Sequence, residues 1–280
     1  MGPISFPGLG IEVNPSPVLV SFGGLSIHWY GIIIAAGMIL AAWYASRRAP
    51  AFGLTEDHIL NLLLTALPFG IVGARAYYCL FNWKLYAANP VSALFIWEGG
   101  LAIYGGVIGA VAGAALYARF SKTPMWPLAD LGGLGLLIGQ GIGRWGNFVN
   151  REAHGGVTGG LLRMGLVEGG QVVYYHPTFL YESVWNALGF VLLHFFSKKH
   201  RRYDGEIFTM YIAWYGLGRA WIEGLRTDSL YLFGTGLRVS QLLAILSCLI
   251  AVGFLIWNLY IRPKDPDGMY VNRRGEKRAL

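Results

Sequence analysis

The segment from Gly143 to Glu152 carries the side chains best suited to chemistry, because it places charged and amide groups at the end of an apolar stretch. Arg144, Asn147 and Asn150 recur every three residues, so on a helix they share one face, and Glu152 follows them. An arginine at mid-membrane costs roughly 2.5–3.5 kcal/mol, so an ionisable group at such depth is by default a functional candidate. The segment therefore predicts a polar site whose partners lie elsewhere in the chain.

A second polar face lies between residues 215 and 226. Tyr215, Arg219 and Glu223 are four residues apart, and Arg226 is three further. Side chains at this spacing lie on one side of a helix, and facing lipid would be too costly for them. We expect this face to point into the protein.

Further polar residues stand in other apolar segments, most of them near a segment end, whereas Arg75 lies nearer mid-membrane. They are His28 and Tyr30 in the first, Arg75 in the second, Tyr104 in the third, and His176, Tyr181 and Glu182 at the start of the fifth. On these counts the arginines outnumber the nearby carboxylates, which would leave positive charge unmatched in a low-dielectric cavity. Guanidinium binds phosphate through paired donors, so an anionic ligand such as a phospholipid headgroup would supply the balance.

Plainer interpretations exist for several of these residues. Arg219 and Glu223 at i, i+4 are also compatible with a structural ion pair, and Arg75 with a pair to Glu98. His28 and His176 are equally typical of histidines at a membrane interface.

The elements that would position these residues are membrane-spanning helices. Hydrophobic residues make up 55% of the chain and charged residues only 13%. About 20 apolar residues cross a bilayer core, and this length predicts seven spans in an all-α, polytopic membrane protein. The expected spans are residues 25–46, 59–81, 92–118, 126–147, 178–197, 205–223 and 239–261. We expect one membrane domain over 1–280, with an outer loop region at 151–177 and a basic cytoplasmic tail at 262–280.

Basic residues predict the orientation of these spans. Fourteen cations follow the first, third, fifth and seventh spans: Arg47, Arg48, Arg119, Lys122, Lys198, Lys199, Arg201, Arg202, Arg262, Lys264, Arg273, Arg274, Lys277 and Arg278. By the positive-inside rule the N-terminus is outside and the C-terminus cytoplasmic. The net charge of +7 thus reflects topology and attraction to anionic headgroups, and it gives no reason to expect nucleic-acid binding.

Cofactor chemistry is not indicated by the sequence. Cys79 and Cys248 lie inside apolar runs, and two such residues make neither a disulfide framework nor a metal site. No phosphate-binding loop or nucleophile elbow appears, so we expect neither cofactor nor metal. The 40 glycines favour close approach of membrane helices. No cleavable signal peptide is evident, and the first span should remain in the mature protein.

The run Gly143-Arg144-Trp145-Gly146-Asn147-Phe148-Val149-Asn150-Arg151-Glu152 resembles the signature of the bacterial prolipoprotein diacylglyceryl transferases. Further elements follow the family's order along almost the whole chain. They are His28-Trp29-Tyr30-Gly31, Gly73-Ala74-Arg75, Trp97-Glu98-Gly99-Gly100, His176-Pro177 through Tyr181-Glu182, and Tyr215 through Arg219 and Glu223 to Arg226. Six elements in one order make the resemblance specific.

The resemblance implies an enzyme of the bacterial cytoplasmic membrane. It would transfer the diacylglyceryl group of phosphatidylglycerol to the lipobox cysteine of a preprolipoprotein signal peptide, forming a thioether and releasing glycerol phosphate. Carried over, Arg144 and Arg219 would hold the phosphate and Glu223 would orient an arginine. The remaining residues would bind or line the site: His28, Tyr30, Arg75, Asn147, Asn150, Glu152, His176, Tyr181, Glu182, Tyr215 and Arg226.

One position departs from the family's pattern. Many members have a histidine before the second glycine pair of the third span, and it has been regarded as the base for the thiol. Tyr104 stands there in this chain. A free tyrosine ionises near pH 10 and a free cysteine near 8.5, so neutral tyrosine is no base. We expect Tyr104 to shape the site and donate a hydrogen bond, with no single side chain acting as an obligatory strong base.

Two other classes of protein remain open at this stage. A transporter of lipids or anionic solutes would also use intramembrane arginines, although its typical inverted repeats are not found here. An intramembrane protease would need a serine and histidine or two aspartates within the spans.

Overall fold

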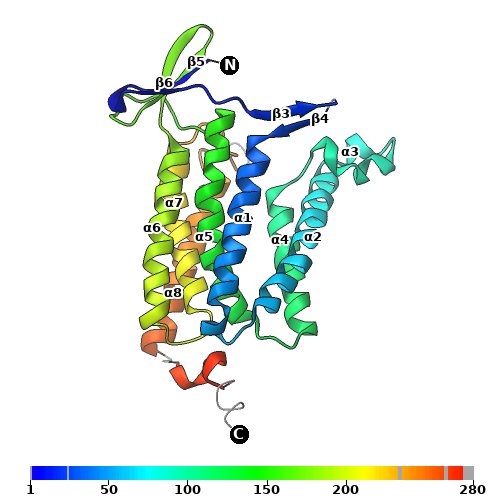
Figure 1. Cartoon of the computed structure of the whole chain (residues 1–280), viewed down its shortest axis with the longest axis vertical. Coiled ribbons are helices and arrows are strands. Elements are labelled where there is room, and N and C mark those ends of the chain that lie inside the picture. Colours follow the sequence, from blue (N-terminus) through cyan, green and yellow to red (C-terminus); the bar gives the residue numbers. More distant parts are fainter. Residues whose placement is uncertain (1, 24, 233–234, 262–263, 274–280) are drawn as a thin grey trace. The chain divides into compact units, whose positions relative to one another are not determined.

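The structure is a computed structural model and describes residues 2–23, 25–232, 235–261 and 264–273, without the side chains of Leu25 and Glu98. Arg262, Arg274, Lys277 and Arg278 of the expected basic tail lie outside the described residues. The chain forms two compact units, one of residues 1–44 and 130–269, the other of residues 45–129 and 270–280. Each unit is mostly helical (Figure 1). The predicted single membrane domain stays a prediction.

Long helices dominate the described part of the chain. Those of 18 residues or more are α1 (Trp29–Arg48), α2 (Glu56–Phe81), α4 (Ile103–Phe120), α5 (Met125–Asn150), α6 (Thr178–Lys199), α7 (Glu206–Leu225) and α8 (Val239–Ile256). Five helices there are long and apolar enough to cross a membrane: α1 with the turn to Phe52, α2, α4, α6, and α8 with the π-helix Trp257–Ile261. The protein is therefore a polytopic membrane protein.

Helices α5 and α7 are as long as the others, yet they are not among these five. They are the two helices that carry Arg144, Arg219 and Glu223 among many glycines. Their polar residues lower their apolar character, so composition alone does not mark them as spans. The expectation of seven spans stays a prediction.

Two predicted spans begin later than the sequence suggested. The first helix starts at Trp29, because residues Leu25–His28 form strand β4. The third starts at Ile103, after the short helix α3 (Trp83–Tyr86) and the 3-10 turns Pro90–Leu94 and Ile96–Glu98. Gly99 and Gly100 adopt φ of 86° and 70°, which glycine tolerates and which stops a helix from continuing through them.

The chain is mostly helical, as expected, but it also forms two small sheets that the all-α expectation did not include. Strands β1 (Ile4–Phe6), β2 (Ile11–Val13), β5 (Met164–Glu168) and β6 (Gln171–Tyr175) make an antiparallel sheet of order β2-β1-β5-β6, and β3 (Val18–Phe22) pairs with β4. Gly169 and Gly170, both with positive φ, form the tight turn that joins β5 to β6.

The four-stranded sheet is anchored on the ends of α5 and α6 (Figure 1). Ile4, Phe6, Met164 and Leu166 from the strands form a buried cluster with Phe179 of α6, and Phe148 of α5 packs against it. Since apolar burial contributes about 25 cal/mol per Å², this cluster fixes the segment between α5 and α6 on the helix ends. The polar residues at those ends are thereby held in place.

In the other unit, α2 and α4 pack against each other through glycine. Gly105, Gly109 and Gly113 lie one turn apart on α4 and are buried. A Cβ atom at Gly105 would overlap the Gly73 carbonyl oxygen, and one at Gly109 would overlap the Phe69 carbonyl oxygen. The expected role of glycine in close helix packing is confirmed for this pair.

The described part of the tail also contacts this unit. A Cβ atom at Gly53, where φ is 74°, would meet the backbone of Val271 and the ring of Tyr270. This part of the tail therefore packs on the turn that follows α1 and is not fully solvated.

Candidate functional site

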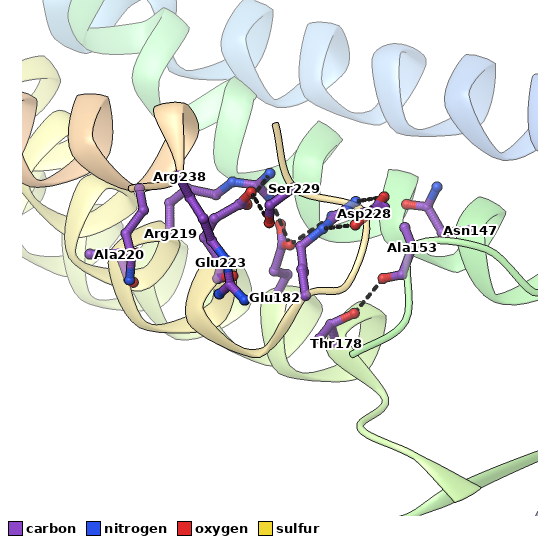
Figure 2. A network of polar contacts seen from close by, with 12 residues as sticks. Asn147, Ala153, Thr178, Glu182, Arg219, Ala220, Glu223, Asp228, Ser229 and Arg238 are labelled. Carbon is purple, nitrogen blue, oxygen red and sulfur yellow. Dashed lines mark hydrogen bonds and ion pairs between the residues drawn. The ribbon is translucent and has the colours of Figure 1, made fainter. Parts of the chain in front are cut away.

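A buried carboxylate lies at the centre of the polar residues of the first unit. Glu182, near the start of α6, is 4% exposed. Its Oε2 lies 2.7 Å from Nη2 of Arg144 on α5, and its Oε1 lies 2.9 Å from Nη1 of Arg219 on α7. Nη1 of Arg226 is 3.7 Å from the same Oε1. Three arginines from separate segments thus converge on one carboxylate, and Figure 2 shows Glu182 beside Arg219.

Glu223 supports Arg219 from the same helix. Its Oε2 is 2.6 Å from Nη2 of Arg219, which confirms the ion pair considered at this spacing. Ser229 Oγ donates to Glu223 Oε1 at 2.8 Å, and Nη1 of Arg238 donates to the Glu223 backbone oxygen at 2.5 Å (Figure 2). Glu223 is 2% exposed, so these partners replace the water that it loses.

Arg226 begins the segment after α7, where the backbone becomes extended with φ −74° and ψ 149°. Its Nε and Nη2 donate to the two carboxylate oxygens of Asp228 at 2.9 and 2.6 Å, a bidentate arrangement. These hydrogen bonds hold the pKa of Asp228 below its ordinary value. Arg226 also pairs with Gly155 in an isolated β-bridge, which ties this segment to the one that follows α5.

The polar face of α5 continues the network. Nη1 of Arg144 donates to Oδ1 of Asn147 at 3.2 Å. Nδ2 of Asn147 and Nδ2 of Asn150 donate to Oε1 of Glu152 at 2.9 and 3.3 Å. The predicted face of Arg144, Asn147 and Asn150 is confirmed, and Glu152 folds back onto it.

Two tryptophans fix the register of α6 against α7. Nε1 of Trp185 donates to the Trp214 backbone oxygen at 3.0 Å, and Nε1 of Trp214 donates to the Trp185 backbone oxygen at 2.9 Å. Their rings stack with centroids 4.4 Å apart, over Gly218 and Gly189. Trp185 is one turn from Glu182 and Gly218 precedes Arg219, so this paired contact aligns the two charged residues.

The predicted histidine and tyrosines of α6 and α7 contact other aromatic rings. Nδ1 of His176 lies 3.3 Å from the Tyr181 hydroxyl, and the Tyr181 ring lies 6.1 Å from that of Trp221. Tyr215 stacks at 5.9 Å on Tyr211. Two further predicted residues, Tyr30 and His28, come from the start of the chain.

Tyr30, in the first turn of α1, lies against α5. Its ring would overlap a Cβ atom at Gly146, so this glycine permits the contact. His28 ends β4 and is exposed.

An apolar groove of about 450 Å³ borders the same helices. It lies along α1, α5 and α6, and its lining includes Trp43, Leu137, Trp145, Ser183 and Phe190. Trp145 directly follows Arg144, Ser183 directly follows Glu182, and Nε1 of Trp145 donates to Ser183 Oγ at 3.1 Å. The groove thus includes the residues that follow Arg144 and Glu182 in the chain, an arrangement that suits an amphipathic ligand.

Arg75 and Tyr104 belong to the other unit. Arg75 is 6% exposed and donates to the backbone oxygens of Ser92, Ala93, Gly99 and Gly100. Its guanidinium thus organises the segment between α3 and α4, whereas the side chain of Glu98 is not among those described. Tyr104 lies in the first turn of α4 and is 37% exposed.

The expected excess of positive charge is not seen among the ion pairs of this cluster. Arg144, Arg219 and Arg226 contact the carboxylates of Glu182, Glu223 and Asp228, three against three. The prediction counted Arg75, which lies in the other unit, and did not count Asp228. An anionic ligand would therefore have to share or replace carboxylate contacts.

Sequence reasoning did not place Asp228, Ser229 or Arg238 in the site. A signal for Asp228 was present, since it follows Arg226 by two residues. Ser229 and Arg238 reach Glu223 only because the segment after α7 turns back. We find no sequence pattern after α7 that predicts this turn.

The fold and the site define an integral membrane protein with a buried guanidinium and carboxylate cluster at the end of a helix bundle. Such forks of donors suit a phosphate-bearing ligand. The profile of the prolipoprotein diacylglyceryl transferase family matches residues 17–257, and the chain belongs to this family.

Curated relatives agree with this assignment. The phosphatidylglycerol–prolipoprotein diacylglyceryl transferase of Geobacillus kaustophilus is 43% identical over 251 residues, which cover 86% of this chain and 90% of the relative. The enzyme of the same name from Bacillus cereus is 44% identical over 259 residues, covering 89% of this chain and 94% of the relative. That from Bacillus velezensis is 41% identical over 89% of this chain and 93% of its own length.

Proposed function

We propose that this protein transfers the diacylglyceryl group of phosphatidylglycerol to the lipobox cysteine sulfur of preprolipoproteins. The sulfur attacks the carbon of the diacylglycerol moiety that is bonded to the phosphate oxygen, this carbon–oxygen bond breaks, and glycerol phosphate leaves with the bonding electrons. The thiol proton passes to water, and the product is a thioether. The observation that carries the proposal is the convergence of Arg144, Arg219 and Arg226 on one point, in a chain of this family.

The arginines stabilise the departing phosphate. Negative charge grows on the leaving group as the carbon–oxygen bond breaks, and pre-oriented donors in a dry site act most strongly on such developing charge. Arg144 and Arg219 hold the phosphate, and Glu223 orients Arg219 through the 2.6 Å contact. Arg226 and Asn147 lie next to them, and Glu152 accepts hydrogen bonds from both Asn147 and Asn150.

The other candidates line or shape the site. Tyr30, Tyr181, Tyr215, His28 and His176 contact the lipid or the peptide, and the groove beside Trp145 takes an acyl chain. Arg75 fixes the segment that leads into α4, and Tyr104 donates a hydrogen bond to the substrate.

The nucleophile belongs to the substrate. Cys79 is buried in α2 and Cys248 is half-buried in α8, which suits packing roles for both. No single side chain acts as an obligatory strong base, since the thiol ionises close enough to neutral pH to lose its proton near a positive cluster.

The site faces the outer side of the bacterial cytoplasmic membrane. Seven helices span it, α5 and α7 included, with the N-terminus outside and the C-terminus cytoplasmic. Supporting this orientation, Arg47 and Arg48 end α1, Arg119 lies in the last turn of α4, and Lys198 and Lys199 end α6. Glu182 of the charged cluster lies at the opposite end of α6 from Lys198 and Lys199, which suits an exported substrate.

The test is a mass spectrum of a lipobox peptide after incubation with the purified, detergent-solubilised protein and phosphatidylglycerol. A matched peptide has serine in place of the lipobox cysteine. We expect a diacylglyceryl mass gain confined to the cysteine peptide. No gain, with the protein folded and lipid bound, would overturn the proposal in favour of a lipid-handling transporter.

A further inference from the structure

Glu182 occupies the position where the three arginines of the site are directed. Both of its carboxylate oxygens contact guanidinium groups, Oε2 with Arg144 at 2.7 Å and Oε1 with Arg219 at 2.9 Å. The two non-bridging oxygens of a phosphate accept the same paired donors as the two oxygens of a carboxylate. Glu182 is therefore bound as a phosphate would be bound.

Several other donors of these arginines contact neighbouring side chains. Nη1 of Arg144 donates to Asn147, Nη2 of Arg219 contacts Glu223, and Nε and Nη2 of Arg226 donate to Asp228. The donors that point to the centre of the cluster are those that contact Glu182. A phosphate seated between Arg144 and Arg219 would compete for them.

Glu182 differs from Glu223 in how it is held. Ser229 donates to Glu223, and Glu223 and Arg219 are one turn apart on the same helix. Within the part of the chain that the structure describes, the polar contacts of the Glu182 carboxylate are to arginines alone. These arginines are 10–21% exposed, so they are more accessible than the carboxylate at 4%.

We infer that Glu182 is an exchangeable internal ligand, which the lipid phosphate displaces from Arg144 and Arg219 and which returns to them when glycerol phosphate leaves. The inference rests on the proposed function and assigns Glu182 a role in ligand exchange, without a role in the transfer step.

Product release gives this exchange a purpose. A phosphodiester carries one negative charge, whereas the released monoester carries about −1.5 to −2 at pH 7. The arginines therefore hold the product more tightly than the substrate. A carboxylate that competes for the same guanidinium groups counteracts this and frees the site for the next lipid.

The experiment measures binding of glycerol phosphate to the purified full-length protein, together with its inhibition of diacylglyceryl transfer. Glu182→Gln keeps the shape of the side chain and removes its charge. We expect glycerol phosphate to bind about tenfold more tightly or better, the size expected for removing one competing charge-assisted interaction. Product inhibition should rise in parallel, and kcat should fall because the product leaves more slowly. A merely structural role of Glu182 would instead weaken the binding of glycerol phosphate.

Glu223→Gln is the matched control, since it removes the same charge from the same buried cluster. If both variants bind glycerol phosphate equally more tightly, only net charge matters and the exchange is refuted. Unchanged or weaker binding in Glu182→Gln also refutes it. Should Glu182→Gln fail to fold, Glu182→Asp, which reaches less far, is expected to tighten binding by a smaller factor, and unchanged or weaker binding there would refute the exchange.

The same measurements separate this inference from the proposed function. If the wild-type protein transfers the diacylglyceryl group but Glu182→Gln binds product no better, the exchange fails and the function stands. If the wild-type protein shows no transfer although Glu182→Gln binds glycerol phosphate more tightly, the exchange stands and the reaction is wrong.

Discussion

The helices of the α2–α4 pair and those of the α5–α6–α7 group are held together by different kinds of contact. Between α2 and α4, backbone approaches backbone at Gly73, Gly105 and Gly109. Among α5, α6 and α7, charged side chains meet at Glu182, and the helices are aligned by Trp185 and Trp214. Glycine leaves no side chain for chemistry, whereas the charged group leaves donors that a ligand can use.

We assign the glycine contacts mainly to stability and the charged cluster mainly to function. A glycine contact depends on shape alone, and adding one methyl group forces the helices apart. A buried charge cluster is weak evidence for stability, because apolar residues of similar volume often serve equally well. Binding of a ligand by these charges would account for the desolvation free energy that burying them costs.

The glycine contact should give the larger loss of stability. In Gly105→Ala the new Cβ overlaps the Gly73 backbone oxygen and Cβ of Tyr77. We expect destabilisation of roughly 1–3 kcal/mol, as for other overpacked sites, measured as a lower thermal midpoint in detergent.

Gly106→Ala is the matched control on the neighbouring residue. Its Cβ would lie 3.6 Å from Cβ of Ala74 and 3.8 Å from the Gly70 oxygen, which are ordinary contacts. Stability equal to or above that of the wild type is expected there. Equal losses in the two variants would contradict the close-packing account.

Tyr104→Phe should have the smallest effect, although Tyr104 lies on the glycine-packed α4. It removes the hydroxyl and keeps the ring, so we expect diacylglyceryl transfer to fall by less than about tenfold, the contribution of one neutral hydrogen bond. The assay is the initial rate of peptide modification at saturating lipid. A loss of several orders of magnitude with unchanged stability would show that the hydroxyl takes part in proton transfer.

Local spacing made much of this molecule predictable. Arg144, Asn147 and Asn150 share a face because of helical periodicity alone, and Arg219 and Glu223 pair for the same reason. Long apolar runs likewise placed the long helices to within a few residues, apart from the starts of the first and third. Seven spans and their orientation rest on the same reasoning.

What sequence reasoning missed depends on contacts between distant segments. The pairing of β1 with β5 joins residues 5 and 165, which are far apart in the chain. The strands β5 and β6 have only five residues each and lie among glycines, so their alternation of apolar and polar residues was hard to recognise. The Arg75 guanidinium donates to four backbone oxygens, and residue types do not reveal which backbone oxygens a side chain will contact. Tertiary contacts decided these features.

The most direct test of the central claim is diacylglyceryl transfer by Arg144→Ala and Arg144→Lys, with insertion and thermal stability measured on the same preparations. We predict that Arg144→Ala loses about 10²–10³-fold in rate while remaining inserted and folded, and that Arg144→Lys, which keeps the charge but not the fork, stays well below the wild type. Rates within a few-fold of wild type in both variants would contradict the account.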